Sequence, residues 1–438
     1  MTTKIEGGDE LEKPVISKRD ILDHLEAQSK TLDNFKIGME YERLGVHVAT
    51  GKALSYTEGI EPILNTLAET DGWEKGLEND RIIFLQKDDN LVTLEPGGRT
   101  EFTSRPCRTI EELMKDANSF RTKLDKIAAE QDAVFLGMGF QPFTSIDEIE
   151  WVPKTRYKYM APFLSETGTM AHEMMKQTAG VQVALDYSNL DDAMRKLRAA
   201  SLCTPFAQAL FASSSIINGK AEKEVCRRGR IWQKTDSARC DIPPFFIDPN
   251  STMDDYAEWI LHMPLMFLER DGVYSEAEGR CLGDLVSAGE ANIYDLEIAL
   301  TQAFPEVRFK RFVEIRSLDS PQPMSLASAA CFWSSLLYGD LDAIFDLLGG
   351  LTHEVFEELR AVAISEGLKG RVGERTIGEW TLDLLAIATQ NSTCISSMKN
   401  LQKRAEMGLS ASDAAADLLA EVASPSEFVS QWNDHRWW

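Results

Sequence analysis

Residues 307–319, VRFKRFVEIRSLD, alternate apolar and charged side chains with the two-residue period of a β-strand. Apart from Arg311, one face of that strand is apolar and consists of Val307, Phe309, Val313 and Ile315. The opposite face carries Arg308, Lys310, Phe312, Glu314 and Arg316. Because removing the partner of a buried charge costs about 3–5 kcal/mol, three cations around one carboxylate predict anionic ligands and a metal ion. An exposed edge strand whose charges prevent pairing is the alternative.

The length and composition are those of a globular protein. The chain has 438 residues, enough for one large domain or several smaller ones, and no uncharged apolar run is long enough to span a membrane. Its net charge of −24 disfavours nucleic acids and anionic membranes as partners. A nucleotide would therefore need a locally basic site. The sequence does not indicate an oligomeric state.

The N-terminal residues and the cysteines bear on the compartment and the domain organisation. Residues 1–20 are acidic and resemble neither a secretory signal nor an Arg-rich transit peptide, so we expect a cytoplasmic protein. We expect a disordered leader at residues 1–14 and one catalytic domain at residues 15–438, mostly helical from about residue 325. Seven scattered cysteines without a CxxC motif argue against a disulfide framework or a zinc site, although a regulatory disulfide remains open.

Further segments are predicted to join the same sheet. The two-residue period recurs at residues 35–48, 81–86, 90–95, 99–104 and 181–187. Thr109, followed three residues later by Glu112, predicts the start of a helix that extends to about residue 130. Because carboxylate-bearing strands lie in distant parts of the chain, we expect an α+β fold with one sheet and helices packed on it.

Four glutamates on these strands could bind a metal ion together with Glu314. Glu40 and Glu42 would project from the same face about 6–7 Å apart. Glu95 and Glu101 flank the tight Pro96-Gly97-Gly98 turn. Carboxylate oxygens suit hard divalent cations such as Mg²⁺, which commonly bridge to phosphates. For each glutamate alone, a solvated strand face is the alternative.

A second basic cluster lies in residues 226–248, which we predict to be a loop. It contains Arg227, Arg228, Arg230, Arg239 and Trp232. Arginine forks bind carboxylate or phosphate in a bidentate manner and stack on aromatic rings, so this segment could hold an amino-acid carboxylate or a nucleotide. A solvated surface loop paired with acidic residues is the alternative. Lys154 and Arg156 are a further candidate pair of the same kind.

Several reaction types lack their sequence motifs. The chain has no GxxxxGK[ST] phosphate loop, no HExxH zinc helix and no GxSxG nucleophile motif. Histidine is scarce, with six residues. The pattern therefore favours metal-assisted phosphoryl transfer, in which positioning and charge neutralisation supply most of the rate.

Six segments in the same order resemble the plant-type glutamate–cysteine ligase family. They are GMEYERLG (38–45), LEPGGRTEFTS (94–104), FLGMGFQP (135–142), TAGVQVALDYS (178–188), RIWQKTD with Arg239, and FPEVRFKRFVEIRSLD (304–319). The resemblance implies a glutamine synthetase-like antiparallel sheet that forms a funnel, with helices packed outside. It also implies ATP and Mg²⁺ as cofactors and the joining of the glutamate γ-carboxylate to the cysteine amine, the first step of glutathione synthesis.

The resemblance also implies roles for individual residues. It assigns the metal to Glu40, Glu42, Glu95, Glu101 and Glu314. It assigns the transferred phosphoryl group to Arg316. From the residues themselves, we expect Lys310 to act beside Arg316, and Lys154 and Arg156 to bind the cofactor. It assigns the amino-acid substrates to Thr178, Gln182, Arg228, Trp232 and Arg239.

The sequence departs from the family pattern at several positions. Ala184 replaces an asparagine, Cys240 a glycine, and Gly229-Arg230 a Ser-His pair, while Ser317 and Leu318 replace small residues. We expect these changes to affect the substrate pocket rather than the metal site. Two alternative functions therefore remain: a γ-glutamyl ligase that uses a different amine acceptor, and a non-catalytic relative that binds ligands.

Overall fold

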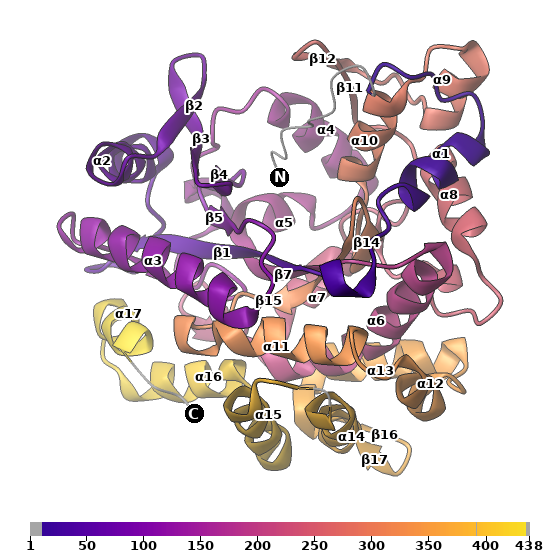
Figure 1. Cartoon of the computed structure of the whole chain (residues 1–438). Coiled ribbons are helices and arrows are strands. Elements are labelled where there is room, and N and C mark those ends of the chain that lie inside the picture. The colour runs from indigo at the N-terminus through magenta and orange to yellow at the C-terminus, as the bar shows by residue number, and fades with distance from the viewer. Residues whose placement is uncertain (1–10, 391, 435–438) are drawn as a thin grey trace.

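A nine-stranded antiparallel sheet forms the centre of the molecule (Figure 1). The computed structural model describes residues 11–390 and 392–434. The strands run in the order β14-β15-β7-β1-β5-β4-β3-β2, and β6 pairs with β1. Their bounds are β1 Ile37–His47, β2 Glu74–Glu78, β3 Arg81–Lys87, β4 Asn90–Leu94, β5 Thr100–Thr103, β6 Ala133–Leu136, β7 Gly180–Leu185, β14 Val307–Phe309 and β15 Val313–Asp319.

Four short two-stranded pairs lie outside the main sheet. They are β8 Ile216–Ile217 with β9 Lys220–Ala221, β10 Cys240–Asp241 with β13 Phe304–Pro305, β11 Phe267–Arg270 with β12 Val273–Glu276, and β16 Arg371–Val372 with β17 Arg375–Thr376. Of these, β10 and β13 pair in parallel. The α+β class predicted from the sequence is confirmed.

Residues 307–319 form a hairpin, so the prediction of one continuous strand is wrong. β14 and β15 pair with Arg308 opposite Glu314, and the Lys310 backbone N–H donates to the Phe312 carbonyl at 3.0 Å. Arg311, which interrupted the apolar alternation, lies in the turn and pairs with Glu297 at 3.3 Å. The alternation resumes with the same parity after the turn, so Arg308 and Glu314 still share one face.

The two faces of the sheet have opposite chemistry. The apolar face includes Met39, Val183 and Ile315, each at most 1% exposed. It packs against two long helices, α6 Leu190–Phe211 and α11 Leu326–Leu337. On the polar face, Glu42 pairs across strands with Glu101, Glu40 with Gln182, and Glu314 with Ala184. Strands from distant parts of the chain therefore bring these carboxylates together.

The remaining helices surround the sheet (Figure 1). They are α1 Lys18–Glu26, α2 Glu61–Asp71, α3 Ile110–Ala129, α4 Tyr157–Thr167, α5 Ala171–Gln177, α7 Arg227–Gln233, α8 Met253–His262, α9 Leu282–Ala288, α10 Ile293–Gln302, α12 Leu341–Leu348, α13 His353–Glu366, α14 Ile377–Gln390, α15 Ile395–Met407, α16 Ala411–Glu421 and α17 Pro425–Asp434. As predicted, α3 begins after Thr109, whose hydroxyl accepts from the Glu112 N–H at 3.2 Å. In Figure 1, α14 to α17 lie below the sheet.

The predicted leader is only partly within the described residues. Residues 1–10 lie outside them, and residues 11–14 run beside the start of α10. The Ile293 N–H donates to the Lys13 carbonyl and the Tyr294 N–H to the Leu11 carbonyl, both at 3.0 Å. These bonds place residues 11–14 beside α10, and the disordered leader stays a prediction. The main apolar cluster extends from Val15 to Ala405, and a second one packs β1 and β6 against α16 and α17. The single domain stays a prediction. None of the described helices is both long and apolar enough to cross a membrane.

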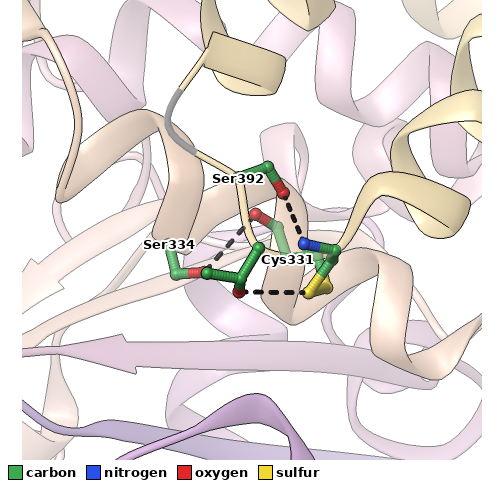
Figure 2. The surroundings of a disulfide bond; sticks show 5 residues. Cys331, Ser334 and Ser392 are labelled. Carbon is green, nitrogen blue, oxygen red and sulfur yellow. Dashed lines mark hydrogen bonds between the residues drawn. A yellow bond between two sulfur atoms is a disulfide. The ribbon is translucent and has the colours of Figure 1, made fainter.

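A disulfide links α11 to the start of α15 (Figure 2). It joins Cys331, which is fully buried, to Cys394 across 63 residues. The Cys394 N–H donates to the Ser392 hydroxyl at 3.0 Å, and the Ser334 hydroxyl donates to the Cys331 carbonyl at 3.4 Å. The other five cysteines are free thiols. The cysteines thus form one bond rather than a framework.

Breaking this disulfide should destabilise the protein. We expect Cys394→Ser to lower the free energy of unfolding by about 2–4 kcal/mol, because the cross-link restricts the unfolded chain. Urea denaturation followed by circular dichroism measures the change, and Cys281→Ser is the control because Cys281 is a half-buried free thiol. An unchanged free energy of unfolding in Cys394→Ser would contradict the prediction. Seven reactive thiols in the denatured, unreduced wild type would show that the disulfide is absent.

Candidate active site

Two cavities meet on the polar face of the sheet. The first has a volume of about 70 Å³, and its lining includes Glu42, Glu95, Arg99, Arg156, Thr178, Arg228, Trp232 and Arg316. The second has a volume of about 240 Å³, and its lining includes Lys30, Lys36, Glu40, Ala184, Asp186 and Glu314. Glu101 and Gln182 line both cavities. These two side chains therefore stand at the boundary between two binding spaces.

Glu314 is the most strongly paired carboxylate of this face. The guanidinium of Arg308 donates to it, and Lys310 and Arg316 lie 3.3 Å and 3.1 Å from its oxygens. Burial raises the pKa of Glu314, but the three cations outweigh burial and hold that pKa well below its usual range. Glu314 is therefore ionised, and it fixes Arg316 at the boundary, where Arg316 also donates to Gln182.

A β-bulge contributes to the position of Arg316. The register between β15 and β7 shifts between Ile315 and Leu318. A bulge places an extra residue on one strand and redirects side chains locally. Arg316 accordingly lines the first cavity, although Glu314, two residues before it, lines the second.

Arg99 pairs with the carboxylates of the first cavity. Its guanidinium lies 3.7 Å from Glu42 and 3.5 Å from Glu95, and it donates to the Met175 carbonyl at 2.8 Å. Glu42 also accepts from the Gly180 N–H at 2.5 Å. Burial nevertheless raises the pKa of Glu42, opposed by Arg99 and reinforced by Glu101. One guanidinium is thus shared by two buried carboxylates.

Among the described residues, no cation forms an ion pair with Glu40, although the charge of Lys310 partly opposes the rise in its pKa. Burial raises its pKa to about 8, and the charges of Glu101 and Glu314 act in the same direction. Its Oε2 atom is buried and finds no hydrogen-bond partner among the residues that the structure describes. An additional cation beside Glu40 would satisfy this oxygen and lower the cost of ionising the group.

Arg228 and Trp232 lie one turn apart on α7, so the prediction of a loop at residues 226–248 is wrong at its start. Arg228 is buried and donates to the Arg316 carbonyl at 2.9 Å. Its Nε and Nη1 atoms have no partner within the described chain. Because an arginine fork binds a carboxylate through two parallel N–H groups, Arg228 can receive an anionic group in the first cavity.

Part of this site was not predicted from the sequence. Arg99 was not selected, and Arg308 was placed on the charged face without a role of its own, although both are buried and pair with site carboxylates. The apolar wall of the first cavity was also missed, and it consists of Met160, Met174, Met175, Met266, Phe267 and Phe304. Only the adjacency of Arg99 to the Pro-Gly-Gly turn could have signalled its role.

Three predicted site residues line neither cavity. Arg239 is fully buried and bonds to Asp236 at 2.7 Å and to the carbonyls of Pro264 and Gln302. Its contact with substrate stays a prediction. Lys154 donates to the Leu94 carbonyl at 2.7 Å and lines a separate cavity. Lys310 acts through Glu314.

The departures from the family pattern also lie away from the first cavity. Ala184 lines the second cavity. A Cβ at Gly229 would lie 3.2 Å from Cys226 and Ile364, which places this position against the core. Arg230 pairs with Glu224 at 2.9 Å. The expectation that these changes alter the substrate pocket is therefore wrong for the first cavity.

The carboxylates do not form a closed metal cage. Among the described residues, no three acidic, histidine or cysteine side chains are grouped as metal ligands. Mg²⁺ usually retains several waters and binds through one or two carboxylates plus substrate phosphates, so a cage is not required. The buried, unpartnered Oε2 of Glu40 fits such a site, and the metal assignment stays a prediction.

The fold and the family follow from comparison with known proteins. The glutamate–cysteine ligase of Francisella tularensis, solved with AMP, shares the fold with a TM-score of 0.57 at 13% identity over 93% of this chain and 90% of that chain. The model described as glutamate-cysteine ligase family 2 matches residues 36–430. This chain belongs to that family.

Plant enzymes are among the relatives. The chain is 34% identical over 382 residues to the chloroplastic glutamate–cysteine ligase of Arabidopsis thaliana, covering 85% of this chain and 73% of the relative. It is 31% identical over 431 residues to the chloroplastic enzyme of Brassica juncea, covering 96% and 82%. These relatives are chloroplastic, which contradicts the cytoplasmic location that we expected from the N-terminal composition.

Replacing Glu40 should stabilise the metal-free protein at high pH. A carboxyl whose folded pKa exceeds its unfolded value costs stability progressively as the pH rises from about 4.5 to about 8. We expect Glu40→Gln to be more stable than the wild type at pH 9 by more than about 1 kcal/mol, the value of one pKa unit.

Urea midpoints at pH 5 and pH 9, with EDTA present, measure this difference. Glu276→Gln, an exposed position on β12, is the control. Equal or lower stability of Glu40→Gln at pH 9 would show that Glu40 is not a destabilising buried acid.

Proposed function

We propose that this protein is an ATP-dependent ligase that joins the γ-carboxylate of glutamate to the amine of cysteine through a γ-glutamyl phosphate. Membership of glutamate–cysteine ligase family 2 supports the reaction class. The observation that carries the assignment of the site is the meeting of two cavities at Glu101 and Gln182, beside Arg316. Two substrates can enter separately and react at that boundary.

The amino acids are assigned to the first cavity. Arg228, two of whose guanidinium nitrogens have no partner among the described residues, receives the α-carboxylate of glutamate, and Thr178 lines the same cavity. Arg316 then faces the γ-carboxylate. The methionine and aromatic wall excludes water from the acyl phosphate and suits a thiol-bearing side chain, because thioethers are polarizable and adapt their shape.

ATP is assigned to the second cavity, with its γ-phosphate at the boundary. Lys30 and Lys36 line this cavity, and Lys310 lies beside Glu314. This placement differs from the assignment of the nucleotide to Lys154 and Arg156, which do not line the second cavity. The AMP complex of the Francisella enzyme is in keeping with nucleotide use.

These residues act by positioning the substrates and by neutralising charge. A γ-carboxylate oxygen of glutamate attacks the γ-phosphorus and releases ADP, and the amine then attacks the acyl carbon and releases phosphate. Arg316, held by Glu314 and Gln182, stabilises the negative charge on the transferred group. Mg²⁺, held by Glu40, Glu42, Glu95, Glu101 and Glu314, would supply neutralisation of the phosphate charges.

The two alternatives are less well supported. A different amine acceptor was suggested by Ala184, Gly229 and Arg230, none of which lines the first cavity. A non-catalytic relative is disfavoured because each of the five predicted carboxylates lies at a cavity wall.

Substrate-dependent phosphate release tests the proposal. With ATP and Mg²⁺, purified protein should release phosphate only when glutamate and an amine acceptor are both present, and EDTA should abolish release. Mass spectrometry should detect γ-glutamylcysteine, with cysteine preferred over other amino acids at equal concentration. Equal phosphate release without glutamate would refute the ligase assignment.

Removing Arg316 should impair the chemical step. We expect Arg316→Ala to reduce kcat by about 10²–10³-fold, the usual cost of losing one donor that stabilises the transition state. Arg311→Ala, in the turn of the same hairpin, is the matched control and should retain activity. Circular dichroism confirms folding, and a folded Arg316→Ala protein with near-normal kcat would remove Arg316 from the mechanism.

A further inference from the structure

A third cavity lies beside the candidate active site, outside the two cavities described above. Its volume is about 660 Å³, within the range of about 300–1,000 Å³ that is typical of small-molecule sites. It lies between the segment before α4, the first turns of α4, and α5. Its walls include Trp151, Val152, Tyr157, Lys154, Lys158 and His172.

The charge of this cavity is opposite to that of the protein. The net charge of the chain is −24, yet none of the described residues that line the cavity is Asp or Glu. Lys154 is 3% exposed, whereas Lys158 is exposed at the rim. The nearby acid Glu78 accepts from the Thr155 N–H at 2.7 Å. The cavity therefore combines an apolar wall with the exposed ammonium group of Lys158 and the buried amine of Lys154, whose pKa burial lowers to about 7.

Two side chains on the floor of this cavity form hydrogen bonds to a residue next to the first cavity. The Lys154 amine and the Tyr157 hydroxyl both donate to the Leu94 carbonyl, at 2.7 Å and 3.0 Å. The next residue, Glu95, lines the first cavity, and Tyr157 lines both cavities. A ligand that contacts Lys154 and Tyr157 would therefore change the support of Glu95.

We propose that the third cavity binds a small amphipathic carboxylate, with an aromatic or branched apolar body, and that its occupancy alters glutamate binding through Leu94 and Glu95. The apolar body lies against Trp151 and Val152, and the carboxylate meets the ammonium of Lys158, with the Lys154 amine at the floor. An uncharged ligand of the same shape lacks the ammonium contact. The binding site stands independently of the proposed ligase function, on which only the effect on glutamate depends.

Isothermal titration calorimetry with 2-naphthoate tests the binding site on the full-length protein. We expect saturable binding to one site, with the neutral 2-naphthamide at least tenfold weaker. Lys158→Glu should weaken 2-naphthoate at least tenfold, because it replaces an attractive charge with a repulsive one. Ala161→Trp should abolish binding by filling the cavity, and Lys399→Glu, an exposed lysine on α15, should have no effect.

Two results would overturn the site. The first is 2-naphthoate binding that is unchanged in both Lys158→Glu and Ala161→Trp, with folding confirmed by circular dichroism. The second is complete displacement of 2-naphthoate by glutamate or by a non-hydrolysable ATP analogue, which would place the probe in the first or second cavity.

Steady-state kinetics tests the coupling. Saturating 2-naphthoate should change the KM for glutamate at least twofold in the wild type and leave it unchanged in Ala161→Trp. An unchanged KM in the wild type would overturn the coupling. Binding without any glutamate-dependent turnover would instead refute the ligase function and leave the site intact.

Discussion

The balance of buried charge on one face of the sheet is the constraint on which the site depends. Five glutamates lie on that face or at its edge, and their mutual repulsion would oppose folding without nearby cations. Arg99, Arg308, Lys310 and Arg316 supply those cations from within the chain. Their distribution is uneven, since Glu314 has three cationic neighbours whereas Glu40 has an oxygen without a partner among the described residues. This asymmetry marks where a divalent cation would be most favourable.

The opposite face of the sheet supports this arrangement. Its apolar side chains are buried against α6 and α11, so the strands cannot shift without exposing the core. A one-residue slip would also move every carboxylate into that core. The packing of the apolar face therefore maintains the register that brings Glu42 next to Glu101. The disulfide between Cys331 and Cys394 extends this support to the C-terminal helices.

The polar face was predictable from sequence because alternation is a local property. The alternation of apolar and charged side chains in residues 307–319 keeps the same phase across the turn at Lys310. Arg308 and Glu314 were therefore correctly placed on one face, even though the hairpin was missed. That turn contains none of the Gly, Pro, Asn or Asp residues that usually signal one. The short helix α7 was missed because its glycine and cluster of arginines resemble a loop. The burial of Arg239 by carbonyls from distant segments could not be predicted, because such contacts are not local in sequence.

The shared boundary at Glu101 and Gln182 also affects the order in which ligands bind and leave. In the proposed arrangement, nucleotide and amino acids occupy separate cavities on either side of these two residues. ADP can then depart without passing through the cavity that holds the peptide product, and a fresh nucleotide can arrive while that product is still bound. Steric blockage therefore imposes no compulsory sequence of arrival or departure on the substrates. Any strict kinetic order would have to arise from one ligand reshaping the cavity of the other.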